Sequence, residues 1–274
     1  MVTAAHRSAS WIAIGSAKAA AEPSGHTYLH YVVQISQSAP SHVANIIDKD
    51  IPRTPIAVSP AALRRVLLSY AVRNPKVGYV QGMSGVGAYL LTHCDEPCAF
   101  WLLAYMVEDQ LPPHFYSADL VGARAELAVV RASVAYQLPE LHDHLAKTAL
   151  GHIVDHALLI PCLVGLFIGL LPSHLLDHVW DELLVPGTGA LVHASVALMR
   201  ALEPSLRNAT TIEEIHQLLE TRNNSGAGRS LSIADAGASC SITGRSVSSA
   251  VHFTLAFATS FQAYREGSCP STEA

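Results

Sequence analysis

Charged residues are scarce in this chain, and the basic ones are not clustered. Lysine, arginine, aspartate and glutamate make up 14% of the 274 residues, and the formal net charge is −5 at pH 7. No block or stripe of lysine and arginine stands out along the sequence. This pattern argues against nucleic acid as the main partner, because proteins bind phosphate backbones through concentrated positive charge.

Cysteines are also few, and their number and spacing do not suit a disulfide framework. The five of them are odd in number and irregularly placed, which indicates a reduced cytosolic protein; they are Cys94, Cys98, Cys162, Cys240 and Cys269. No second ligand pair accompanies the His93-Cys94 and Cys98 group at zinc-site spacing, and the histidines are scattered. We therefore expect no bound metal.

Long hydrophobic runs are almost absent. The N-terminus "MVTAAHRSASWIAIG" lacks the continuous apolar core of a signal peptide. The uncharged stretch "ALLIPCLVGLFIGLL" covers residues 157–171 and contains Pro161. It is shorter than the ~17–25 residues that a spanning helix requires. We interpret it as a buried core helix, and an integral membrane protein built around it is the weaker alternative.

Alternation with a period of two residues is missing, so strands are not expected and the sequence predicts an all-α fold. In "SPAALRRVLLSYAVRNP", Ser59 suits an N-cap and Pro60 the first helical position, while Asn74 precedes a proline that ends the helix. A second helix is predicted from about 80 or 81 to 92, and a third after Asp95. Further helices are expected at about 120–137, 139–147, 155–170, 173–184, 189–203 and 211–221.

The chain is long enough for one large domain or two small ones, and half of it is hydrophobic. We expect one multi-helical domain over residues 1–221, with its motifs in 45–221. Residues 222–247 are rich in serine, glycine and alanine, and are predicted to be a flexible segment. Residues 248–274 are expected to form a C-terminal helix and tail.

Two short stretches each place one polar side chain beside helix-breaking residues. In "DIPRT", residues 50–54, Pro52 fixes its own φ and favours an extended Ile51, and Pro55 does the same for Thr54. We therefore expect Arg53 on a segment that is not absorbed into a regular helix. In "NPKVGYVQGM", residues 74–83, Gln81 stands between two glycines at the expected start of a helix.

These stretches belong to three ordered motifs that resemble those of the TBC domain family. "IIDKDIPRT" matches the pattern I-x-x-D-x-x-R through Ile47, Asp50 and Arg53, and "VGYVQGM" matches Y-x-Q through Tyr79 and Gln81. "LLDHVWDELLVPG", residues 175–187, resembles the later V-W-D helix of the family. The resemblance covers roughly residues 45–220 and implies an all-helical TBC-like domain.

The resemblance implies a GTPase-activating protein for a Rab-type small GTPase, acting on the catalytic site of its partner in vesicle trafficking. Arg53 would stabilise charge around the γ-phosphate, and Gln81 would orient the attacking water. Asp50 would hold the arginine loop, and Tyr79 would help to fix the turn that carries Gln81. The chain would need no cofactor of its own, since GTP and Mg²⁺ belong to the partner. It would be cytoplasmic and recruited to endomembranes only indirectly, through the GTPase.

The residue types suit this chemistry independently of the family. Catalysis of phosphoryl transfer depends mainly on positioning and on neutralising charge on the phosphoryl oxygens. Guanidinium is always charged and presents a fork of N–H donors. A carboxamide both donates and accepts, so one glutamine can hold a water and a phosphate oxygen together.

Other interpretations remain open at this point. Arg53 could be a surface residue paired with Asp50, and Gln81 could be an ordinary polar residue at a helix start. Trp180 and Asp181 are expected to serve packing and helix support rather than chemistry. The whole chain could also be a catalytically weak TBC-like scaffold that binds a GTPase or another partner without accelerating hydrolysis, because the connection at 54–59 is short.

Overall fold

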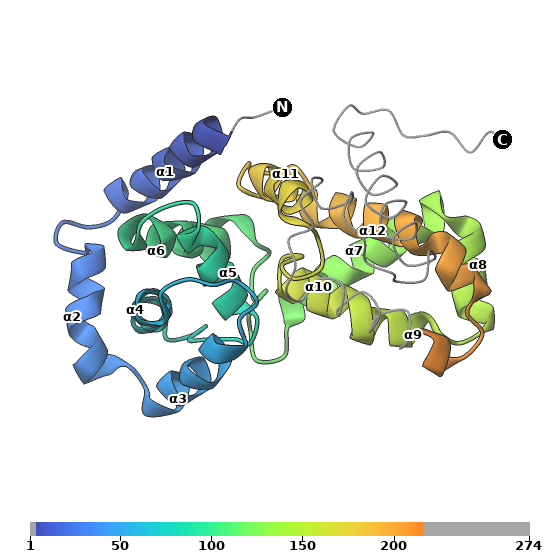
Figure 1. Ribbon diagram of the computed structural model, residues 1–274, viewed down its shortest axis with the longest axis horizontal. Coiled ribbons are helices and arrows are strands. Elements are labelled where there is room, and N and C mark those ends of the chain that lie inside the picture. Colours follow the sequence, from blue (N-terminus) through green and yellow to red (C-terminus); the bar gives the residue numbers. More distant parts are fainter. Residues whose placement is uncertain (1–3, 216–274) are drawn as a thin grey trace, which may run out of the picture. The chain divides into compact units, whose positions relative to one another are not determined.

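The computed structural model describes residues 4–215 (Figure 1). Over this range the regular structure is entirely helical, without strands, which confirms the all-α prediction. The predicted flexible segment at 222–247, the predicted helix and tail at 248–274 and the second half of the predicted helix at 211–221 lie outside the described residues.

The helices group into two compact units. The first unit comprises the chain up to Ala125 together with Val164–Ile168 and Asp181–Gly187. Its regular elements are α1 (Ala4–Ala20), α2 (Tyr28–Ser38), α3 (Ser41–Asp50), the 3₁₀ turn η1 (Ile51–Arg53), α4 (Pro60–Arg73), α5 (Met83–Leu91), α6 (Glu96–Tyr105), the π-helical turn η2 (Met106–Gln110) and the start of α7 (Val121–Gln137).

The second unit comprises Glu126–Leu163, Gly169–Trp180 and the described residues from Thr188 onward. It holds most of α7 and its regular elements are α8 (Pro139–Lys147), α9 (Gly151–Val154), the π-helical turn η3 (Asp155–Leu159), α10 (Ile160–Val164), most of α11 (Ser173–Leu183) and α12 (Ala190–Asn208). Within this unit α8 contacts both α9 and α12.

The centre of the first unit is α4, which is seen end-on in Figure 1 with α2, α3, α5 and α6 around it. Its N-cap is Ser59, whose Oγ accepts a hydrogen bond from the Ala62 backbone at 3.4 Å. The helix ends at Arg73, as predicted. One face of the helix is apolar and fully buried, with four residues at helical spacing: Leu63, Val66, Leu67 and Tyr70.

Several predicted boundaries were wrong for local conformational reasons. Helix α5 begins at Met83 rather than at 80 or 81, because Gly82 has φ 107°, which a helix does not allow. The predicted helix at 155–170 begins at Gly151 and ends at Val164, since Leu166 and Phe167 take positive φ values of 47° and 63°. Helix α12 continues through Pro204 to Asn208 instead of ending at 203.

Three helices before Arg53, α1 to α3, were not predicted individually. In α1, alanine and serine fill many positions that would otherwise carry large apolar side chains, so its stripe is weak in sequence. It nevertheless packs on α6, and its Trp11 is buried. Packing against α6 therefore stabilises a helix that the local sequence pattern did not predict.

No single helix within residues 4–215 is long and apolar enough to cross a membrane. One pair, Pro139–Lys147 with Gly151–Val164, meets the length and composition requirement only when taken together, and it is bent by 109°.

Candidate functional site

Arg53 is the last residue of a 3₁₀ turn that continues directly from α3. Ile51 has φ −51° and ψ −49°, so the expectation that Pro52 would make it extended was wrong. The proline effect on the preceding residue is only a bias, and here the turn of α3 continues through it. Thr54 is extended, with φ −67° and ψ 127°, as Pro55 predicts. Its Oγ1 donates to the Asp50 carbonyl at 3.1 Å, which closes the corner after Arg53.

The side chain of Arg53 is exposed, and within residues 4–215 no hydrogen bond or ion pair is seen for its guanidinium. The suggested surface pair with Asp50 is not formed, because the Asp50 carboxylate accepts from Tyr79 instead. The arginines of α4 behave differently, since each is bound to carboxylates: Arg64 to Asp48, Arg65 to Glu96, and Arg73 to Glu22 and Glu108.

Gln81 lies in the loop between α4 and α5, residues 74–82, and its side chain is exposed. The first part of the loop is a turn in which the Asn74 carbonyl accepts from the backbone N–H of Gly78 at 2.8 Å. Gly78 has φ 59°, a left-handed conformation that suits glycine. The last part is a second turn, in which Val80 O accepts from Met83 N at 3.0 Å. Gln81 thus lies within the second of two hydrogen-bonded turns.

Gly82 fixes the end of this loop. Its φ of 107° is strained for any L side chain. A Cβ at this position would also lie 3.2 Å from Val164 Cγ1 and 3.3 Å from the Val164 carbonyl oxygen. The backbone therefore passes close to Val164 immediately after Gln81, and both the conformation and the space require glycine.

A hydrogen bond joins the two motifs. The Tyr79 hydroxyl donates to Asp50 Oδ2 at 2.8 Å. Burial raises the pKa of Tyr79, a hydrogen bond with Ser84 opposes this, and the bond to Asp50 raises it again, so the hydroxyl remains a donor at neutral pH. Arg53 is three residues from Asp50, and Gln81 is two from Tyr79, about 10 and 7 Å of extended chain. Both exposed side chains are therefore held close to one shared contact.

The arrangement offers an external ligand one guanidinium and one carboxamide. Within the part of the chain that the structure describes, no group of three or more His, Cys, Asp and Glu side chains could hold a metal ion. The two side chains can neutralise negative charge and hold a water by hydrogen bonds.

Comparison with known proteins assigns this geometry to a family. The family model described as the Rab-GTPase-TBC domain matches residues 5–206. The chain belongs to the Rab-GTPase-TBC domain family. The match covers more of the chain than the three motifs do, since it includes α1 and α2. The resemblance stated from those motifs is confirmed.

Two relatives are much longer than this chain, which matches only part of each. It is 33% identical over 187 residues to TBC1 domain family member 2A of Mus musculus, covering 64% of this chain and 20% of the relative. It is 30% identical over 145 residues to TBC1 domain family member 2B of Homo sapiens, covering 53% and 15%. The chain thus spans about a fifth or less of the length of these relatives.

Two solved structures share the fold. The Chlamydomonas flagellar RabGAP TBC domain superposes with a TM-score of 0.70 at 25% identity, covering 95% of this chain and 80% of that one. The Ypt/Rab-GAP domain of Gyp1p gives a TM-score of 0.62 at 15% identity, with coverages of 96% and 89%, and supports the fold alone. Both confirm the all-helical TBC architecture.

Asp181, in the third motif of the TBC domain, has a structural role in the first unit. Asp181 accepts hydrogen bonds from Arg7 Nε at 2.8 Å, from Arg7 Nη2 at 2.9 Å and from the Trp11 indole at 3.1 Å. Its carboxylate therefore anchors α1, which agrees with the predicted role in helix support. Sequence spacing could not show this contact, because the partners are about 170 positions apart.

Thr54, Asn74 and Gly78 shape the two loops, but the sequence did not single them out as site residues. Each has a local signal in retrospect. Threonine before proline is extended, asparagine before proline favours a turn, and glycine suits positive φ. These signals identify turns but do not show which polar side chain a turn presents.

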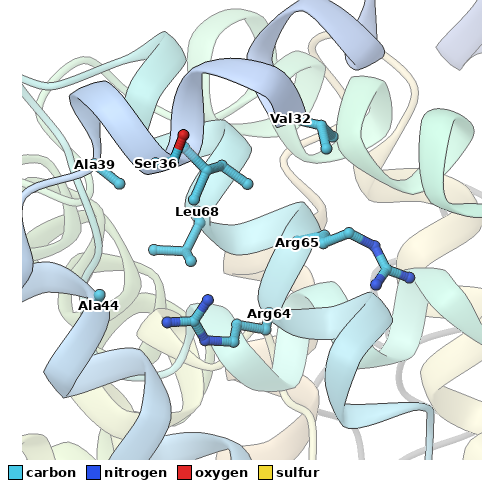
Figure 2. A pocket seen from close by; sticks show the side chains of 8 residues that line it. Val32, Ser36, Ala39, Ala44, Arg64, Arg65 and Leu68 are labelled. Atoms are coloured by element: carbon cyan, nitrogen blue, oxygen red, sulfur yellow. The ribbon is translucent and has the colours of Figure 1, made fainter.

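One depression lies apart from the two loops. It measures about 500 Å³ and is lined by α2, α3 and α4 (Figure 2). Arg64 and Arg65 stand on its α4 side, and Leu68 and Ala44 also face it. Neither Arg53 nor Gln81 lines it, so this depression is not part of the candidate site.

Proposed function

We propose that this TBC domain accelerates GTP hydrolysis by a Rab-type small GTPase, with Arg53 and Gln81 inserted together into the catalytic site of the partner. The observation that carries the proposal is the Tyr79–Asp50 hydrogen bond, because it joins the arginine and glutamine motifs while both side chains stay exposed. The nucleotide and Mg²⁺ belong to the GTPase. Membranes are reached only through that partner.

Arg53 supplies positive charge where negative charge develops around the transferring phosphoryl group. Its guanidinium has no carboxylate bound to it within residues 4–215, so docking into the partner breaks no ion pair there. An arginine finger supplied in trans is worth ~10³–10⁵ in rate. This corresponds to about 4–7 kcal/mol of activation free energy.

Gln81 orients the attacking water and takes the place of the glutamine that the GTPase uses by itself. The amide can donate to a phosphoryl oxygen while it accepts from the water, a combination that charged side chains do not offer. The turn that contains Gln81 and the turn before it hold its backbone before the partner arrives. Less conformational entropy is then lost on docking.

Phosphate release from a panel of GTP-loaded Rab GTPases tests the proposal. The variants are Arg53→Ala and Gln81→Ala. The matched controls are Arg64→Ala and Gln37→Ala, which alter a partly exposed arginine and an exposed glutamine of the same unit. Wild type and controls should accelerate at least one GTPase, and both finger variants should lose nearly all of the effect. Equal rates for wild type and finger variants on every GTPase would refute it.

The same experiment separates catalysis from scaffolding. If the chain captures a GTPase in its GTP form but leaves the hydrolysis rate unchanged, the scaffold alternative is correct and the finger mechanism is not. Acceleration that disappears in Arg53→Ala rules the scaffold alternative out.

A further inference from the structure

A cluster of charged side chains lies inside the first unit, at the end of α4 from which the Gln81 loop starts. We call it the Arg73 cluster, and it consists of Arg73, Lys18, Glu22, Glu108 and Asp109. Its members come from α1, the turn after α1, α4 and η2. No part of the finger chemistry uses these residues.

Arg73 makes contacts through all three guanidinium nitrogens. Toward Glu22, Nη1 donates at 2.8 Å and Nη2 at 2.6 Å. Toward Glu108, Nε donates at 3.0 Å and Nη2 at 2.9 Å. Nη1 also donates to the Tyr31 hydroxyl at 3.1 Å, and the guanidinium carbon lies 5.0 Å from the centre of the Trp101 ring. The planar fork is therefore held on its edges and on a face.

The ion pairs of Arg73 are largely shielded from water. The side chains of Arg73, Glu22 and Glu108 are 11%, 14% and 19% exposed. Desolvation offsets much of the attraction in such pairs, so they add little to stability compared with apolar packing. Removing one partner, in contrast, leaves a charge without compensation. The directional contacts of Arg73 thus fix a geometry more than they stabilise the fold.

The geometry that Arg73 fixes is the start of the Gln81 loop. Arg73 is the last residue of α4, and Asn74 follows it as the C-cap. The Asn74 carbonyl accepts from Gly78 N at 2.8 Å, and its side-chain oxygen accepts from Val77 N at 3.3 Å. The Asn74 amide also donates to the Tyr70 hydroxyl at 3.3 Å. A displacement of Arg73 therefore passes through Asn74 to the turn that sets Tyr79 and Gln81.

We propose that Arg73 is a positioning residue for Gln81. Through the Arg73 cluster, α1 and η2 also help to position the loop that carries Gln81. The inference rests on the proposed GTPase activation for its effect on rate, but not for its effect on the loop. Three supports then hold the glutamine loop. Arg73 and Asn74 fix its start, the bond from Tyr79 to Asp50 fixes its middle, and Gly82 fixes its end.

Hydrogen exchange of the full chain tests the positioning directly. The variants are Arg73→Lys, which keeps the charge without the fork, and Arg73→Gln, which removes the charge. The matched control is Arg65→Gln. Arg65 lies on the same helix as Arg73, and the change breaks its bidentate pair with Glu96. We expect the amides of residues 77–83 to exchange at least tenfold faster in both Arg73 variants and at the wild-type rate in the control.

Unchanged exchange at residues 77–83 in a folded Arg73→Gln protein overturns the proposal. If Arg73→Gln does not fold, Glu22→Gln and Glu108→Gln decide the question in the same assay. Each of them removes one of the two carboxylates that hold Arg73 and leaves the other. Wild-type exchange in both then overturns the proposal, and faster loop exchange supports it.

A double-mutant cycle tests the consequence for catalysis on a GTPase that the wild type accelerates. We expect Arg73→Gln to lower kcat about 10- to 100-fold, the effect of a small misplacement, with KM within twofold. In a Gln81→Ala background it should lower kcat no further. An equal fall in both backgrounds shows a merely structural residue. If the wild type accelerates no GTPase, the proposed function fails, and the exchange experiment still decides the role of Arg73.

Discussion

Replacing Tyr79 by phenylalanine removes the hydrogen bond that joins the Arg53 and Gln81 loops and leaves the ring in place. The lost group is a hydroxyl that donates to Asp50 Oδ2 at 2.8 Å. The bond from Thr54 Oγ1 to the Asp50 carbonyl does not involve Tyr79 and should remain. Arg53 and Gln81 keep their own side chains. The change therefore tests positioning separately from the chemistry of the fingers.

The expected magnitudes follow from the type of contact. A hydrogen bond to a charged group contributes about 1.5–3 kcal/mol. Asp50 is partly exposed, and water can replace part of the loss. We therefore expect the free energy of unfolding to fall by about 1.5–2 kcal/mol, the lower part of that range. The hydrolysis rate should fall about 10- to 100-fold, as for a misplaced catalytic group. Removal of Arg53 should cost more, ~10³–10⁵-fold.

The assay combines single-turnover phosphate release with urea unfolding of the same preparations. Tyr28→Phe is a matched control, because its hydroxyl donates to Glu96 Oε2 at the same distance of 2.8 Å. Both variants should lose similar stability, and only Tyr79→Phe should lose activity. If the two variants were equally active and equally destabilised, the Tyr79–Asp50 hydrogen bond would not be positioning Arg53 and Gln81. A further loss on adding Asp50→Ala to Tyr79→Phe would also count against it.

Three other changes have defined outcomes. Gly82→Ala should cost about 1–3 kcal/mol of unfolding free energy in urea, because φ is 107° and the new Cβ meets Val164; full stability would contradict that backbone. The hydrogen bond from Arg73 lowers the pKa of Glu22. The ionised Glu22 carboxylate therefore stabilises the folded state above about pH 5, and this stabilisation is lost as the carboxylate is protonated. Unfolding curves of wild type and Glu22→Gln should accordingly differ at pH 7 and converge toward about pH 3; a constant difference would refute this. Ser59→Ala should lower the unfolding free energy by about 1 kcal/mol through loss of the α4 cap, with unchanged phosphate release.

The features of the fold that could be predicted from the sequence are those with local causes. Helix α4 was predicted from its cap, from Pro60 at its first position and from the Asn74-Pro75 stop, and its bounds are those observed. The start of α5 was misplaced by two or three residues, since nothing in the sequence shows that Gly82 takes φ 107°. The π-helical turns at Met106 and Asp155 also have no recognisable signal in the sequence. They depend on how neighbouring turns pack.

For the candidate site, sequence motifs named the residues but could not connect them. Asp50 and Tyr79 were expected to support separate loops, whereas they bond to each other across 29 positions. The conformation of Ile51 was wrong because a bias from Pro52 was taken as decisive. The sequence did not predict the role of Arg73, because its partners Glu22 and Glu108 lie 51 and 35 positions away. Contacts of this kind become visible only when the helices are placed.

The most direct test of the central claim uses a Rab GTPase whose own catalytic glutamine has been replaced by alanine. In the proposed mechanism, this TBC domain supplies the glutamine as well as the arginine. Phosphate release from the altered GTPase should therefore be accelerated by wild type and not by Gln81→Ala or Arg53→Ala. Acceleration of the unaltered GTPase together with none for the altered one would contradict the account, because the water would then be oriented by the GTPase itself.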